Sequence, residues 1–134
     1  MTQEVGKTPE VASGELTLHE QVVAKIVGGA AKEVEGVYAM GTGSFAEAVA
    51  GAAGRVAGGE DVKKGVRVEV GKKEAAVDLW LSVEYGHNIP TVVQKVRQMI
   101  TDRVYEIAGL VTKEINVDVV DIHLPGEEPE RRVE

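Results

Sequence analysis

Residues 66–85 read VRVEVGKKEAAVDLWLSVEY, and this stretch holds the pattern that decides the fold. Its first five residues alternate valine with charged side chains, which is typical of a strand with one buried face. After a turn over residues 71–74, a longer run alternates again and places these apolar side chains on one face: Val77, Leu79, Leu81, Val83 and Tyr85. Its other face carries Ala76, Asp78, Trp80, Ser82 and Glu84. The stretch therefore predicts a β-hairpin that buries one side of a sheet.

An amphipathic helix is predicted directly after the hairpin, from Ile89 to the residue before Gly109. Pro90 falls in its first turn, where the missing N–H does no harm, and glycine favours the C-terminal cap. The apolar side chains that recur at helical spacing are Ile89, Val92, Val93, Val96, Met99, Ile100, Val104, Ile107 and Ala108. A last strand is expected over residues 110–124, with either a bulge or the end of the strand where two consecutive valines at residues 119–120 break the alternation.

A first helix is predicted from about Thr17, because Thr17 and Glu20 have the spacing of a capping box. Apolar residues then recur at helical spacing as far as Val34. Gly28 and Gly29 interrupt the helix, where each glycine costs about 1 kcal/mol relative to alanine. We therefore expect another element to pack closely there. A short strand over residues 37–40 follows.

The predicted order is helix, strand, strand, strand, helix, strand. Helices and strands with one apolar face each bury those faces in two layers. We expect an α/β fold of the two-layer α+β type, in which two main helices pack on one face of a small sheet of about four strands. The opposite face, with Asp78 and Trp80, is expected to meet water or a partner.

The chain of 134 residues is expected to form a single domain over residues 15–124. Residues 1–14 and 125–134 are polar, are broken by proline and glycine, and are predicted to be disordered tails. Residues 41–59 are rich in glycine and alanine and are predicted to be a flexible connection within the domain.

The composition excludes several classes of site. The net charge of −7 argues against broad binding to phosphate backbones. The absence of cysteine excludes disulfides, thiolate nucleophiles and cysteine-bound metals. No signal peptide and no run of about 18 apolar residues is present, so we expect a cytoplasmic protein without a transmembrane segment.

No catalytic constellation is recognisable, and we predict neither an enzyme nor a bound cofactor or metal. The three histidines, His19, His87 and His123, have no partner at a catalytic spacing. Two alternatives stay open, an enzyme or a binding site for a hard cation, because carboxylates gather on the predicted open face. These carboxylates belong to Asp78, Glu84, Glu114 and Asp118. Residues 51–55 (GAAGR) match the GxxG letters of an RNA-binding KH loop. We regard nucleic-acid binding as the weaker hypothesis, since the chain has no basic footprint.

Two features suggest an interaction surface. Basic residues gather near the hairpin and form either a solvated edge or a docking patch for an anionic partner or a lipid surface: Lys63, Lys64, Arg67, Lys72 and Lys73. Trp80 falls on the face opposite the predicted core, where an aromatic side chain marks either an interface or a site covered by another part of the chain.

Several stretches together resemble the alkaline shock protein family, the envelope stress response proteins of Gram-positive bacteria. They are residues 14–18 (GELTL), 33–37 (EVEGV), 65–70 (GVRVEV), 76–86 (AVDLWLSVEYG), 89–90 (IP), 109–110 (GL) and 114–119 (EINVDV). The resemblance covers about residues 14–124. The chain differs from the family pattern in its glycine- and alanine-rich residues 41–59 and in carrying tryptophan at residue 80.

The resemblance implies a small, non-enzymatic α/β protein of the envelope or alkaline stress response. It implies self-association into a homo-oligomer and docking to a membrane-anchored protein partner at the inner face of the cell membrane. It also implies an alternative, the regulation of early fatty-acid synthesis. A second alternative, from the residues themselves, is a nucleic-acid-binding module that uses Gly51–Arg55 and the lysine-rich hairpin.

Overall fold

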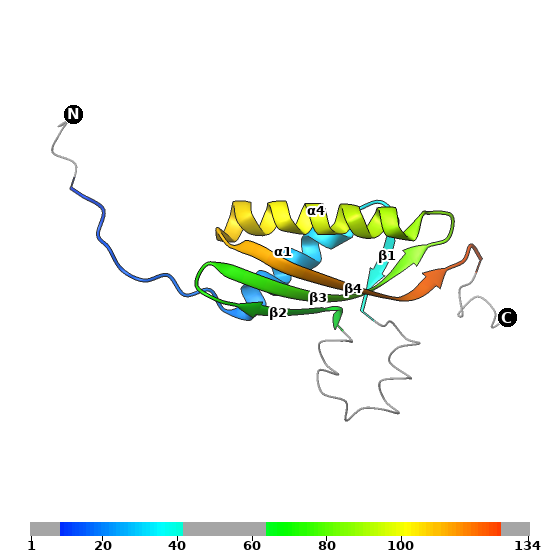
Figure 1. Cartoon of the computed structure of the whole chain (residues 1–134), viewed down its shortest axis with the longest axis horizontal. Helices are drawn as coiled ribbons and strands as arrows, with labels where there is room; N and C mark the ends of the chain where they lie inside the picture. The colour runs from blue at the N-terminus through cyan, green and yellow to red at the C-terminus, as the bar shows by residue number, and fades with distance from the viewer. Residues whose placement is uncertain (1–8, 42–63, 127–134) are drawn as a thin grey trace, which may run out of the picture.

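The computed structural model describes residues 9–41 and 64–126 of the chain. Its elements follow the predicted order, as Figure 1 shows: α1 (Glu20–Lys32), β1 (Val37–Met40), β2 (Val66–Val70), β3 (Glu74–Glu84), α4 (Ile89–Ala108) and β4 (Val111–His123). The two-layer α+β fold with two helices and four strands is therefore confirmed.

The sheet is built around β3, which pairs with each of the other three strands. β4 pairs with one side of β3 in parallel, while β1 and β2 both pair with the other side in antiparallel orientation. β1 pairs with β3 as far as Leu81, and the pairing of β2 with β3 starts at Leu79. The two short strands therefore lie in line along one edge of β3. The predicted β2–β3 hairpin is confirmed, and the parallel pairing makes the sheet mixed.

The break between β1 and β2 lies opposite Trp80. The Gly41 N–H donates to the Trp80 carbonyl at 2.6 Å, and the Trp80 N–H donates to the Gly65 carbonyl at 2.9 Å. Gly65 has φ +93°, and a Cβ there would clash with the backbone of Gly41. Glycine at residue 65 therefore lets the two chain segments that flank residues 42–63 meet at one point of the sheet.

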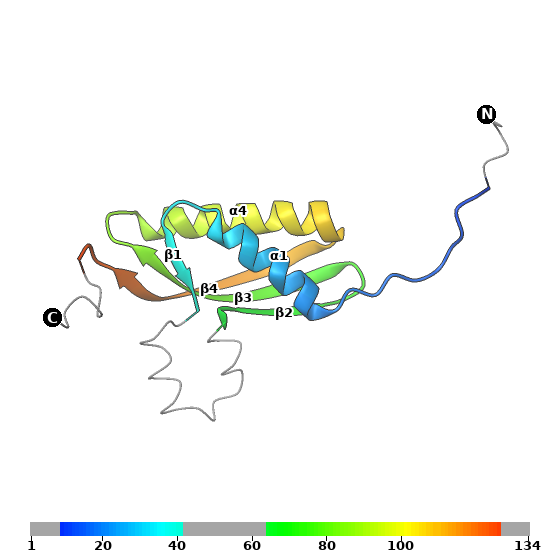
Figure 2. The same cartoon turned by 180° about the vertical axis from the view of Figure 1, so that it is seen from behind.

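Both helices cover the same face of the sheet, as Figures 1 and 2 show. α1 packs on β1 and β2, α4 packs on β4, and the two helices contact each other. The core between the layers contains fully buried side chains from both helices and from the central strand, among them Val23, Val27, Leu79, Leu81, Val96, Ile100 and Val104. The predicted placement of both helices on one face is confirmed.

The two helices begin in different ways. The side chain of Asn88 caps α4 by accepting the backbone N–H of Thr91 at 3.0 Å, and Gly109 ends the helix at φ +74°. The capping box predicted at Thr17 is wrong, because α1 begins at Glu20 after His19, without a side-chain cap. Leu18 packs partly buried against the core from extended chain, and this tertiary contact prevails over the local capping pattern.

Three other details of the sequence prediction can be judged. The β4 bulge is confirmed, since the register passes from Val119 to Asp121 and leaves one extra residue. Tyr85 and Ile107, predicted on the apolar faces, are 62% and 64% exposed because each lies at the end of its element, beyond the facing layer. Of the two glycines where another element was expected to pack closely, Gly28 faces β2, since an added Cβ would meet Val66 at 3.8 Å. At Gly29 the expectation is wrong, because a Cβ there would meet nothing within 4 Å.

The domain boundaries stay predictions. Most of residues 1–14, 41–59 and 125–134 lies outside the described residues. Within the predicted tails, residues 9–14 form no helix or strand.

Candidate functional site

The sheet face that the two described helices leave uncovered is the candidate site, and we call it the open face. β3 directs alternate side chains to it, and the neighbouring strands add theirs at paired positions. Its residues are Tyr38 from β1, Arg67 and Glu69 from β2, Glu74, Ala76, Asp78, Trp80, Ser82 and Glu84 from β3, and Lys113, Glu114, Asn116, Asp118, Asp121 and His123 from β4. Figure 1 shows both described helices on the other side of the sheet.

A polar network crosses the open face along one line of paired residues. Arg67, Asp78 and Asn116 lie opposite one another on β2, β3 and β4. The Arg67 Nη2 donates to Asp78 Oδ2 at 3.1 Å, and the Asn116 Nδ2 donates to Asp78 Oδ1 at 3.0 Å. Asn116 also donates to Glu114 Oε2 at 3.0 Å. Both carboxylates are thereby held in fixed positions.

Trp80 lies next to this network. Its side chain is on the open face, as the alternation predicts, and it is half-buried. The Arg67 guanidinium carbon is 5.7 Å from the centre of the indole ring, within the range of a cation–π contact. Arg67 therefore joins the charge of Asp78 to the aromatic surface of Trp80, and these three predicted site residues form one cluster.

A second aromatic feature of the open face was missed by the sequence interpretation. The rings of Tyr38 and His123 stack with centroids 3.9 Å apart and an interplanar angle of 3°. Tyr38 is on β1 and His123 is on β4, so the stacked pair connects the two strands that flank β3. Ser82, on the strand between them, is only 8% exposed. No sequence signal links these two distant residues, because the contact depends on the order of the strands.

The lysines predicted to belong to the same surface lie elsewhere. Lys72 and Lys73 occupy the β2–β3 turn, about seven residues along β3 from Trp80, or roughly 23 Å for extended chain. Lys64 is exposed just before β2, and Lys63 lies outside the described residues. The structure thus separates Lys72 and Lys73 from the Trp80 cluster, and the open face itself is rich in carboxylates.

The helix layer contains a separate ion pair. Arg103 of α4 contacts Glu33, after α1, at 2.8 Å and 3.0 Å through its two terminal nitrogens. The hydrogen bond from Arg103 lowers the pKa of Glu33, and the charge of Arg103 acts in the same direction. This pair links the two helices and belongs to the layer on the other side of the sheet from the open face.

Within the described residues, no group of three or more His, Asp or Glu side chains is arranged to hold a metal ion. One hollow on the described surface lies near Lys32 and Tyr38 and another near Leu16 and Val111, and neither is lined by the open-face carboxylates considered for catalysis. Over residues 9–41 and 64–126, neither helix has the length and apolarity that crossing a membrane requires.

Comparison with known proteins gives a family. A sequence model of the alkaline shock protein family, described as having a cell envelope-related function, matches residues 8–124. A "Stress response regulator gls24 homolog" of Streptococcus pyogenes serotype M3 is 38% identical over 109 residues, which cover 81% of this chain and 59% of that protein. The uncharacterized protein YqhY of Bacillus subtilis is 33% identical over 109 residues, which cover 81% of this chain and 77% of YqhY.

The chain therefore spans less than two-thirds of the length of the streptococcal gls24 homologue. No solved structure matches it. The resemblance seen in the sequence is confirmed by a match that includes both helices and all four strands. The chain belongs to the alkaline shock protein family, which has a cell envelope-related function.

Proposed function

We propose that this chain serves the envelope stress response as a non-enzymatic interaction protein that associates with itself and docks to a protein partner. The family description and the name of the streptococcal relatives support the stress role. The observation that carries the docking role is the Trp80–Arg67–Asp78 cluster on a sheet face that neither described helix covers. Tryptophan and arginine are among the residues most enriched at the energetic centres of interfaces.

The charge of the open face indicates the chemistry of the partner. On the described strands, its carboxylates outnumber its arginine and lysine side chains, with Glu69, Glu74, Asp78, Glu84, Glu114, Asp118 and Asp121 against Arg67 and Lys113. A partner that presents lysine or arginine around an apolar anchor would be complementary in charge to this surface. Cytoplasmic segments next to membrane spans carry an excess of lysine and arginine. A membrane-anchored partner of this kind would hold the chain at the inner face of the cell membrane.

The same charges weigh against the alternatives. A carboxylate-rich face repels phosphate backbones, which disfavours nucleic-acid binding there. Gly51–Arg55, the KH-like residues, lie outside the described residues. The carboxylates of Asp78 and Glu114 already accept hydrogen bonds from Arg67 and Asn116, which supports a structural rather than a catalytic role. Regulation of early fatty-acid synthesis stays a prediction of the family resemblance alone.

The docking role can be tested with variants of the open face. Trp80→Ala and Arg67→Glu should each abolish capture of a partner from the membrane fraction of envelope-stressed cells, with the captured protein identified and then titrated in purified form. Tyr85→Ala is the matched control, because Tyr85 is an exposed aromatic residue outside the open face. Equal affinity of the purified partner for the parent chain and the two open-face variants would contradict the role of this surface.

A further inference from the structure

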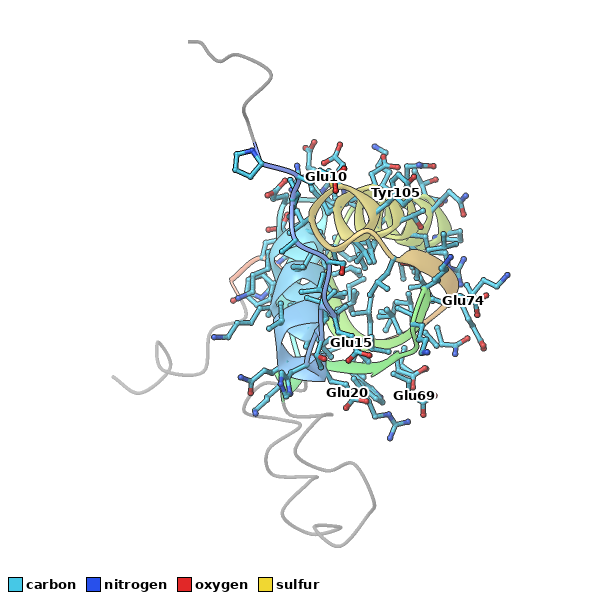
Figure 3. All side chains as sticks on the ribbon, turned by 90° about the vertical axis from the view of Figure 1, so that its left-hand side faces the viewer. Glu10, Glu15, Glu20, Glu69, Glu74 and Tyr105 are labelled. Atoms are coloured by element: carbon cyan, nitrogen blue, oxygen red, sulfur yellow. The ribbon has the colours of Figure 1, made fainter. Side chains whose placement is uncertain are left out.

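β4 forms one edge of the sheet. Its inner side pairs with β3, and no other strand among the described residues pairs with its outer side. β4 has 13 residues, whereas β1 and β2, which share the other edge, have four and five. Figure 3 looks along the strands from the end that carries Glu74, with α1 on the left and the start of β4 on the right. A long uncovered edge strand is uncommon, because its unpaired backbone groups can accept a further strand.

A hydrogen bond from α4 shows which backbone groups of β4 point outward. The Arg97 Nε donates to the Ile115 carbonyl at 3.2 Å, so this carbonyl is directed away from β3. Successive residues of a strand turn their backbone groups to opposite sides, and the register with β3 is unbroken over residues 114–119. The N–H and C=O groups of Val117 and Val119 therefore point outward as well. We call the outer side of residues 114–119 the β4 edge, which is about 20 Å long.

The apolar side chains of this stretch are incompletely covered. Ile115, Val117 and Val119 pack against the core and are only half-buried. The residues that pair with them on β3 are at most 1% exposed: Val77, Leu79 and Leu81. The helix layer therefore buries the central strand completely and leaves part of the neighbouring apolar row exposed at the β4 edge. A further strand beside β4 would cover this row with the alternate side chains that it directs to the same face.

The same stretch is acidic on its open-face side. Glu114 and Asp118 are exposed, and Asp118 has no ion-pair partner among the described residues. Lys113, which precedes this stretch, pairs instead with Glu74 at 3.8 Å. Opposite charges that face each other on neighbouring strands stabilise the pairing, and like charges destabilise it. The β4 edge therefore favours a strand that carries lysine or arginine, and it disfavours the equally acidic β4 of a second copy.

We propose that the β4 edge accepts an extended segment of a partner protein as an additional strand, and that apolar residues alternate with lysine or arginine in this segment. In strand addition, main-chain hydrogen bonds supply affinity and the alternate side chains supply specificity. The apolar side chains of the segment cover the half-buried row, and its basic side chains lie beside Glu114 and Asp118. The inference rests on the proposed function for the existence of a protein partner, and it specifies the conformation and the residue pattern of the segment that binds.

A synthetic peptide tests the β4 edge without a cellular partner. The peptide has about ten residues, in which valine alternates with lysine, and saturates the isotope-labelled full chain. The amides of Ile115, Val117 and Val119 should exchange with solvent quickly in the free chain and at least about tenfold more slowly with the peptide. The amides of Asn116 and Asp118 face β3 and should exchange slowly in both states. Slow exchange of all five amides in the free chain would overturn the inference, since the chain's own residues, or a second copy if dilution restores exchange, would already occupy the edge.

Methylation of the peptide nitrogens tests whether the contact is made by the main chain. The N–H groups of the valines and those of the lysines point to opposite sides of an extended peptide, and only one of these sets can face β4. Methylation of that set should weaken binding in calorimetry at least about tenfold, and methylation of the other set should have little effect. Equal affinities of the two methylated peptides would overturn strand addition.

A charge exchange tests the residue pattern. The peptide with glutamate in place of lysine should not bind the parent chain, and it should bind the double variant Glu114→Lys, Asp118→Lys. The double variant Glu10→Lys, Glu15→Lys is the matched control, because it changes the net charge equally at exposed residues outside the sheet. If both double variants lose the lysine peptide equally, or if the parent chain does not bind that peptide at about 1 mM, the inference is wrong. Capture of a partner by the open face is measured separately with Trp80→Ala and Arg67→Glu, so either hypothesis can fail without the other.

Discussion

Substitution of Gly65 by alanine tests the close approach of Gly65 and Gly41 opposite Trp80 in the sheet. Gly65 has φ +93°, and an added Cβ would clash with the Gly41 backbone. The left-handed backbone costs about 1–2 kcal/mol for a residue with a Cβ. Moving Gly41 and Gly65 apart also weakens the two hydrogen bonds to Trp80, each of which contributes about 0.5–1.5 kcal/mol. We therefore expect Gly65→Ala to lower the free energy of unfolding by about 2–5 kcal/mol.

Gly86→Ala supplies the control for the backbone contribution. Gly86 has φ +103°, but a Cβ there would meet nothing within 4 Å. This variant should lose only the backbone contribution of about 1–2 kcal/mol. The entropy change that alanine brings to the unfolded chain is common to both variants and cancels in the comparison.

Urea denaturation followed by the fluorescence of Trp80, the single tryptophan, measures both variants. Equal losses at Gly65 and Gly86, within about 0.5 kcal/mol, would refute the close approach of the two chain segments at Trp80.

Three further predictions concern the helix layer. Gly29→Ala should raise the free energy of unfolding by about 0.5–1 kcal/mol, because the site is helical and a Cβ there has open space; a loss of stability in calorimetry would contradict this. Asn88→Ala should lower it by about 1 kcal/mol in the same measurement through loss of the cap on Thr91, whereas Asn88→Asp should keep most of it. The Arg103 hydrogen bond lowers the pKa of Glu33 in the folded state. The ion pair therefore stabilises the fold at pH values above 4.5, the ordinary pKa of the glutamate, and this stabilisation is lost as the pH falls through the lowered pKa. Arg103→Gln should therefore make the urea midpoint of unfolding fall less steeply as the pH is lowered below 4.5. An unchanged dependence of the midpoint on pH would contradict a stabilising Arg103–Glu33 ion pair.

The strand pairing decides which charged residues share a surface with Trp80. In the sequence, five basic residues and Trp80 lie close together, within residues 63–80, and suggest one patch for an anionic partner. The strand geometry sends Lys72 and Lys73 to the far end of the hairpin. It places Arg67 among carboxylates that come from β3 and from the distant β4. The open face is therefore negatively charged because of the way in which β2, β3 and β4 pair, and the order of residues along the chain does not show this.

Local sequence patterns were enough to establish the order of the elements, the β2–β3 hairpin, the α4 boundaries and the β4 bulge. These follow from periodicity, from proline and glycine at helix ends, and from the apolar face that each element must bury. The pairing of β3 with β1 and with the distant β4 came from the folded chain alone, and with it the contact of Asn116 with Asp78 and the Tyr38–His123 stack. The same holds for Leu18, which packs against the core from the extended chain before α1 rather than from the helix. Contacts between residues far apart in sequence depend on how two layers pack as a whole, and no local pattern of side chains encodes that choice.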